Sequence, residues 1–240
     1  MFFIPTSYLK FEGRLGLDYY DSTTNPITTY RSNETNAGPG AWDGGWFRLN
    51  SIRNTEFNFD FIGYFNKNFA KISLNALAGF NFRNLRWSSS TLGADVLTVP
   101  DIFTISNVKG SPVTAMDNVW IRNNSLFSSV SFGYDNFIFV DGTMRKDWSS
   151  TLRTPFSYPS ISFSFLPLEA FGIASDALTY LKLRGGWAQV GSATGAYQID
   201  PYFSAGNNTI YGVTQYSQAT TFPPASLQPE KVETSEVGLE

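Results

Sequence analysis

The chain has 240 residues, with 17 Lys and Arg against 20 Asp and Glu, so its formal net charge is -3 at pH 7. This near balance gives no reason to expect nucleic acid or an anionic membrane surface as a partner. Because Cys and His are both absent from the sequence, disulfide scaffolds, Cys/His zinc sites, Ser-His-Asp triads and Cys-His pairs are excluded. We therefore expect no enzyme, no catalytic residue, no metal site and no cofactor.

Aromatic residues make up 17% of the chain, and its 22 Phe outnumber all Lys and Arg combined. Enrichment in aromatic residues and Gly, with little charge, is typical of strands joined by loops. No apolar run reaches the about 20 residues that a membrane-spanning helix needs. The composition thus favours an all-β protein.

Apolar and polar residues alternate with period two along much of the chain, which predicts strands with one apolar and one polar face. Within YPSISFSF (158–165), for example, Ile161 and Phe163 alternate with Ser160 and Ser162. About eight strands are expected in chain order, near 8–20, 46–64, 69–88, 122–134, 137–148, 158–168, 180–192 and 231–240. Several exceed the about 5–6 residues that are usual in globular proteins.

The predicted connections alternate in length. Long loops are expected at 21–45, 89–121 and 193–230, and shorter links at 66–68, 135–136, 149–157 and 169–179, the last with room for one helical turn. Brief turns on one side and extended loops on the other are the construction of outer-membrane barrels.

Two architectures can use such strands. In a membrane barrel the apolar face meets lipid, whereas in a soluble sandwich it meets a second sheet. Strand length and loop parity favour an antiparallel up-and-down transmembrane β-barrel segment, an incomplete barrel whose unpaired edges lie near 8–20 and 231–240. The alternative is a soluble, aromatic-rich β-sandwich that binds carbohydrate.

Several stretches resemble one family, the SusC/RagA-type TonB-linked (TonB-dependent) outer-membrane transporters, which import glycans or peptides. They are DGTMRKDWSSTLRTPFSYPSISFSF (141–165), LKLRGGWAQVG (181–191), LQPEKVETSEVGLE (227–240) and LTVPDIFTISNVKGSP (97–112). The third has Gln228 where the family usually has Lys. The resemblance runs from about residue 46 onward and is strongest over 137–192.

This resemblance implies that residues 1–240 are part of a TonB-dependent receptor-like barrel of about 22 strands, without its plug domain and terminal strands. It implies the outer membrane of a Gram-negative bacterium, contact with outer-membrane lipid, and a SusD-like lipoprotein lid over the long loops. Coupling to the TonB complex would use an N-terminal region outside this sequence. The expected function is active import of glycans or peptides, with these strands in the barrel wall and the loops contacting substrate and partner.

Five aromatic residues are candidates for substrate binding. Trp42 and Trp46 flank a Gly-rich stretch, AWDGGW, and either stack on a ligand or belong to the aromatic girdle at a membrane interface. Tyr197, Tyr202 and Tyr211 lie along 193–230 and suit contact with either a ligand or a partner protein.

Four charged residues are expected to face the lumen by strand alternation: Arg145 and Asp147 in one strand, Lys182 and Arg184 in another. They either line the substrate path or form ion pairs with one another, with a neighbouring strand or with the plug, since charges inside membrane proteins usually pair.

Overall fold

The computed structural model describes residues 1–29, 45–174, 178–218, 220, 222–224 and 227–240. Within these residues, no helix is long and apolar enough to cross a membrane. Contacts divide the chain into two compact units, which are described separately. Unit 1 comprises Met1–Leu15, Asn58–Arg83 and Ile121–Glu240, and unit 2 comprises Gly16–Phe57 and Asn84–Trp120.

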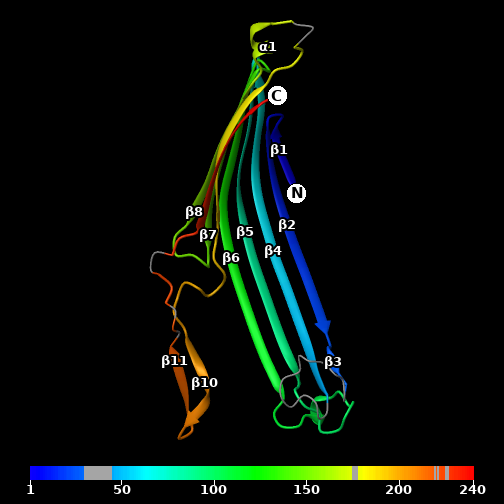
Figure 1. Ribbon diagram of the computed structural model, residues 1–240. Helices are drawn as coiled ribbons and strands as arrows, with labels where there is room; N and C mark the ends of the chain where they lie inside the picture. Colours follow the sequence, from blue (N-terminus) through cyan, green and yellow to red (C-terminus); the bar gives the residue numbers. More distant parts are fainter. Residues whose placement is uncertain (30–44, 175–177, 219, 221, 225–226) are drawn as a thin grey trace. The chain divides into compact units, whose positions relative to one another are not determined.

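Ten strands form one antiparallel, up-and-down sheet (Figure 1). They are β1 (Phe2–Thr6), β2 (Leu9–Thr24), β3 (Ile27–Thr28), β4 (Trp46–Phe69), β5 (Ile72–Ala94), β6 (Val113–Tyr134), β7 (Ile138–Ser149), β8 (Phe156–Phe165), β9 (Leu183–Ser192) and β12 (Glu230–Leu239). Their order is β1-β2-β4-β5-β6-β7-β8-β9-β12, and β3 pairs with β4. The sheet is open in the described residues, so the predicted all-β, up-and-down class is confirmed.

All eight predicted strands are present, but several boundaries and one edge are wrong. Strand β6 begins at Val113, well before 122, and β4 continues to Phe69, so the turn predicted at 66–68 lies at 70–71 instead. The turn at 135–136 is confirmed. The segment 8–20 is not an edge, because β1 pairs with β2 in antiparallel register.

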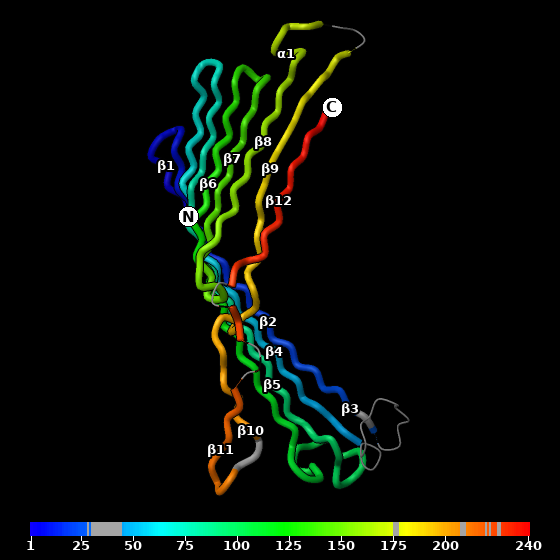
Figure 2. Tube along the Cα trace, turned by 60° about the vertical axis from the view of Figure 1, so that its left-hand side comes forward, coloured from blue at the N-terminus to red at the C-terminus, as the bar shows by residue number. Residues whose placement is uncertain are grey.

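Two of the predicted connections also differ from the structure. The link expected at 169–179 covers 166–182, contains helix α1 (Pro167–Phe171), and is longer than the link at 150–155. The segment 193–230 is not all loop, because β10 (Phe203–Ile210) and β11 (Val213–Gln218) form a separate two-stranded sheet within it. This hairpin is the orange element in both ribbon and tube views (Figures 1 and 2).

In unit 1 the register aligns polar and apolar residues in adjacent rows across β6, β7, β8, β9 and β12. The polar row is Ser131, Asp141, Ser162, Gly186 and Glu236. The apolar row, one position along, is Phe132, Val140, Phe163, Gly185 and Val237. Since successive side chains of a strand point to opposite faces, these rows lie on the two sides of the sheet.

Large side chains of the apolar row of unit 1 are exposed, whereas some residues of its polar face are buried. On the apolar row, Phe132, Phe163 and Val237 are 37%, 52% and 92% exposed. On the polar face, Ser125 is 0% and Glu12 only 8% exposed. A soluble sandwich buries its apolar face under a second sheet, and in the described part of unit 1 no second sheet covers the apolar row.

Unit 2 has a small core of its own. Phe47, Ala94 and Leu97 are buried together, and Phe103 and Val108 pack against them. An isolated bridge joins Leu97 to Val108 across the connection between β5 and β6. The loop predicted at 89–121 is therefore in part strand and in part an ordered turn that contains a 3-10 segment, Ile105–Asn107.

The turns at 70–71 and 135–136 lie together in unit 1. The Nζ of Lys71 is 2.5 Å from Oδ2 of Asp135, and the backbone N–H of Asp135 donates to the carbonyl of Lys71 at 2.7 Å. The hydrogen bond with Asp135 raises the pKa of Lys71 above its ordinary value of 10.5. Ala70, Asp135 and Asn136 all have positive φ, a conformation that the short polar side chains of Asp and Asn tolerate.

We expect the pair to contribute to stability below the ordinary lysine pKa and to lose that contribution as pH rises through the raised value. An NMR titration of the Lys71 side chain should give a midpoint above the ordinary value, and Asp135→Asn should move the midpoint down toward it. Equal midpoints in the two proteins would contradict the pairing.

Candidate lumen wall and ligand pocket

Arg145 and Asp147 form an ion pair on the polar face of unit 1. The Nε of Arg145 donates to Oδ1 of Asp147 at 2.8 Å, and its Nη2 donates to Oγ of Ser125 at 2.7 Å. The register places Asp147 directly across from Ser125, so the guanidinium lies along the row that both residues share. This arrangement pairs the charge of Arg145 within the sheet.

Lys182 and Arg184 share one carboxylate. Lys182 Nζ lies 3.5 Å from Oε2 of Glu240, and Arg184 Nε lies 3.2 Å from Oε1 of the same residue. Arg184 pairs with Gly238 across β9 and β12, and a Cβ at that glycine would meet Arg184 Nε at 2.6 Å. Both cations therefore form ion pairs in the structure.

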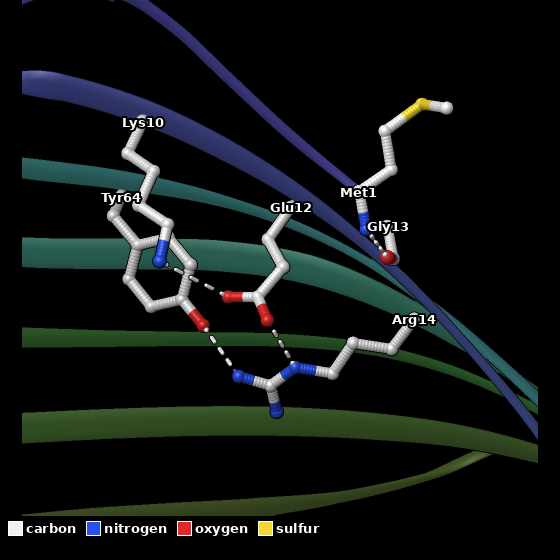
Figure 3. Close-up of polar contacts among 6 residues, drawn as sticks. All are labelled: Met1, Lys10, Glu12, Gly13, Arg14 and Tyr64. Carbon is white, nitrogen blue, oxygen red and sulfur yellow. Dashed lines mark hydrogen bonds and ion pairs between the residues drawn. The ribbon is translucent and has the colours of Figure 1, made fainter.

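A further charged cluster lies on β2 and β4 (Figure 3). The carboxylate of Glu12 accepts from Arg14 Nε at 2.7 Å and pairs with Lys10 Nζ at 3.4 Å. Arg14 Nη2 in turn donates to the hydroxyl of Tyr64 at 3.2 Å. Lys10, Glu12 and Arg14 are spaced two residues apart in one strand and so share a face, and this spacing is the signal for the cluster in the sequence.

A pocket of about 620 Å³ lies in the segment between β9 and β12. Its lining combines aromatic, proline and uncharged polar side chains with one acid: Tyr197, Gln198, Asp200, Tyr202, Ser204, Gln218, Thr220, Phe222, Pro223, Pro224 and Leu227. The volume falls within the range of about 300–1,000 Å³ that is usual for ligand sites. This pocket is the candidate binding site.

Contacts from outside the pocket hold its rim. Arg153 Nη2 donates to the carbonyl of Ile199 at 2.9 Å and pairs with the carboxylate of Asp200. The hydroxyl of Thr194 donates to Oε1 of Gln198. The register of the β10–β11 hairpin pairs Phe203 with Gln218. This pairing brings the two ends of the hairpin together at the pocket.

The structure brings two of the five predicted aromatic residues, Tyr197 and Tyr202, into this one pocket. Tyr211 lies at the hairpin turn with φ 49°, fully exposed and outside the pocket lining. Trp46 begins β4 in unit 2, where the guanidinium of Arg48 lies 5.6 Å from its ring. Trp42 lies outside the described residues.

Sequence reasoning missed the hairpin and the rest of the pocket. The dipeptide Tyr211-Gly212 has positive φ at both residues. It forms the two-residue loop that is typical of tight β-hairpins, and Gly at its second position was the available signal in the sequence. Phe222 and Gln218 carried no local signal, because they reach the pocket only through the fold of the segment.

These features define a class: an open, antiparallel, up-and-down sheet with an exposed apolar face and a charged, internally paired polar face. Solved structures share this fold. The structure of the RagAB peptide transporter matches 99% of this chain with a TM-score of 0.85 and 19% sequence identity. Structures of the RagAB peptide importer in the closed-closed and open-open states match with TM-scores of 0.84 and 0.80, at 19% and 20% identity over 99% of this chain.

The chain spans 27%, 26% and 26% of the lengths of those three chains, about a quarter in each case. No family model matches the chain, and no curated protein matches it. At this level of identity the structural similarity establishes the fold.

Proposed function

We propose that this chain is part of an outer-membrane active transporter of the SusC/RagA, TonB-dependent type, which imports glycans or peptides. Its strands form part of the barrel wall, and its long connections contact substrate and partner. The observation that carries the proposal is the exposed apolar row of unit 1, in which large apolar side chains such as Phe163 stay exposed while Ser125 and Glu12, on the opposite face, are buried. Lipid is the environment that such a face suits.

The height of the apolar face supports this assignment. On β7, outward-facing residues run from Ile138, paired with Tyr134, to Trp148, paired with Asn124. A strand rises about 3.3 Å per residue, so Ile138 and Trp148 are about 33 Å apart along the strand. A tilt of about 40° reduces this length to about 25 Å, the height of the apolar band of outer-membrane barrels.

Aromatic residues lie at both ends of this band, as the girdles of such barrels do. Tyr134 and Phe137 make an edge-to-face contact at one end, with ring centroids 5.5 Å apart. At the other end, Lys146 Nζ lies 5.3 Å from the centre of the Trp148 ring. A lysine beside a tryptophan suits an interface where the ammonium reaches water and the ring stays partly apolar.

The opposite, polar face would line the lumen, and its paired charges would keep the path hydrated without leaving isolated charges in the wall. In this proposal residues 1–240 are a partial TonB-dependent receptor-like barrel of a Gram-negative outer membrane and are not an enzyme. Similarity to RagAB peptide importer chains supports import. A SusD-like lipoprotein lid, a plug that gates the lumen and coupling to the TonB complex follow from the sequence resemblance to the family.

Fractionation of the complete protein in a Gram-negative host tests this proposal. We expect it in the outer-membrane fraction, resistant to carbonate and urea extraction and released as a folded protein only by detergent. Its far-UV circular dichroism in detergent should be that of a β protein. A folded monomer in buffer without detergent would overturn the proposal.

A further inference from the structure

We propose that the pocket between β9 and β12 binds a neutral oligosaccharide. This inference rests on the proposed import function and narrows its substrate class. The pocket combines three elements: exposed aromatic rings, uncharged polar side chains, and an absence of unpaired charge among the described lining residues. Each of these elements bears on the chemistry of the ligand.

The segment that forms the pocket carries almost no charge. Residues 201–229 contain no Asp, Glu, Lys or Arg, although charged residues make up 15% of the chain. Among the described lining residues, Asp200 is the one with a formal charge, and Arg153 pairs with it. A charged ligand group would therefore lose water here without gaining an opposite charge, which is costly.

Aromatic side chains surround the same cavity. Tyr197, Tyr202 and Phe222 line it, and each exposes more than half of its surface. Flat, rigid rings of this kind provide a large contact area at low cost in conformational entropy. They can cover the apolar faces of sugar rings in the same way that they cover other apolar ligand surfaces.

The polar lining residues suit a ligand that is rich in hydroxyl groups. Gln198 and Gln218 each carry an amide with both donor and acceptor atoms, and Ser204 adds a hydroxyl. A sugar hydroxyl also donates and accepts, so either orientation of an amide can be matched. Asp200, with its charge balanced by Arg153, adds carboxylate oxygens that accept hydrogen bonds.

Peptides fit this chemistry less well. Their termini are charged near neutral pH, and about a quarter of the residues in average proteins are charged. A site that accepts mixed peptides would need groups that pair with these charges. Acidic oligosaccharides also fit this pocket less well, because the described lining residues offer no unpaired cation for their carboxylates.

Binding to the complete transporter in detergent tests the inference. The probes are an array of neutral oligosaccharides from glucans, mannans and xylans, a set of oligogalacturonates, and a mixed peptide library, with calorimetry on each hit. We expect a neutral oligosaccharide to bind. Tyr202→Ala should weaken its binding by about tenfold or more, while Tyr202→Phe, which keeps the ring, should retain most of it.

Tyr211→Ala is the matched control, since Tyr211 lies in the same segment but outside the pocket lining and should leave affinity unchanged. Failure of every neutral oligosaccharide to bind would overturn the inference. It would also be overturned if peptide binding were the activity lost in Tyr202→Ala, or if oligosaccharide binding survived that change. A detergent-dependent outer-membrane protein that binds peptides in this pocket would still satisfy the proposed function. The oligosaccharide inference and the proposed function can therefore fail separately.

Discussion

Replacing Phe163 by Lys is expected to destabilise the folded protein in a bilayer by about 1–2 kcal/mol, between the about 2–4 kcal/mol that a cation costs at the midplane of a barrel and the about 0–1 kcal/mol that it costs near the interfaces. Phe163 lies in the apolar row between Val140 and Gly185, two residues along the strand from the end of the apolar band at Ile138. Its side chain is about half exposed, so in water the same change would cost little. The sign and size of the effect therefore report what the apolar face contacts.

Ser162→Lys is the matched control, one residue away on the opposite face. Ser162 pairs with Asp141 and with Gly186, and Gly186 pairs with Glu236. A lysine at this position would meet two carboxylates in a polar environment, so we expect little loss of stability. Denaturant titrations of both variants, refolded into lipid vesicles, give the two free energies of unfolding.

Phe163→Leu separates the effect of charge from that of packing. A Cβ at Gly185 would meet the Phe163 ring at 2.6 Å, so the ring covers that glycine, and its removal has a cost of its own. We expect the Phe163→Leu variant to lose only a minor part of the folding stability that the Phe163→Lys variant loses. Equal stability of the Phe163→Lys and Ser162→Lys variants in vesicles would contradict a lipid-facing role for the apolar row.

Period-two alternation was sufficient to find β7, β8, β9 and β12, because one face of each strand is largely apolar and the other largely polar. The pattern fails where both faces are polar or exposed. The first part of β6, including Val113–Met116, has no buried side chain, so nothing in the pattern marks its start. Strand β1 was missed because FFIPT is too short and too uniformly apolar to show alternation.

Residues of the candidate sites were predictable where a single strand determines their direction. Arg145 and Asp147 share a face because they are two residues apart, and Lys182 and Arg184 do so for the same reason. Their partners depended on register. Glu240 reaches Lys182, just before β9, and Arg184, in β9, because β12 pairs with that strand. The Arg153–Asp200 pair, separated by 47 positions, left no local pattern to read.

Replacing Asn107 by Ala is expected to unfold the ordered turn between β5 and β6, at a cost of about 2–4 kcal/mol. Asn107 is 9% exposed. Its Nδ2 donates to the carbonyls of Val99 and Ile102 at 2.7 and 2.8 Å, and its Oδ1 accepts from the N–H of Val99 at 2.9 Å. Alanine removes all three hydrogen bonds, and a hydrogen bond of this kind contributes about 0.5–1.5 kcal/mol to stability.

The effect should be local, because the turn belongs to unit 2 and has its own small core. Hydrogen exchange at the Val99 amide, and the rate of proteolytic cleavage within 95–112, should rise by about two orders of magnitude or more in Asn107→Ala, the factor that corresponds to about 3 kcal/mol. The amides of β7 and β8, in unit 1, should keep their exchange rates.

Two further variants test whether the amide group of Asn107 is responsible. Ser106→Ala, at the neighbouring exposed position whose hydroxyl forms a hydrogen bond with the hydroxyl of Thr104, should leave exchange at Val99 unchanged. Asn107→Asp keeps an oxygen for the Val99 N–H but turns the donor into a carboxylate oxygen that faces two carbonyls, so it should be as harmful as alanine. If Asn107→Asp retained the protection of Val99, the two donated hydrogen bonds would not be what orders the turn.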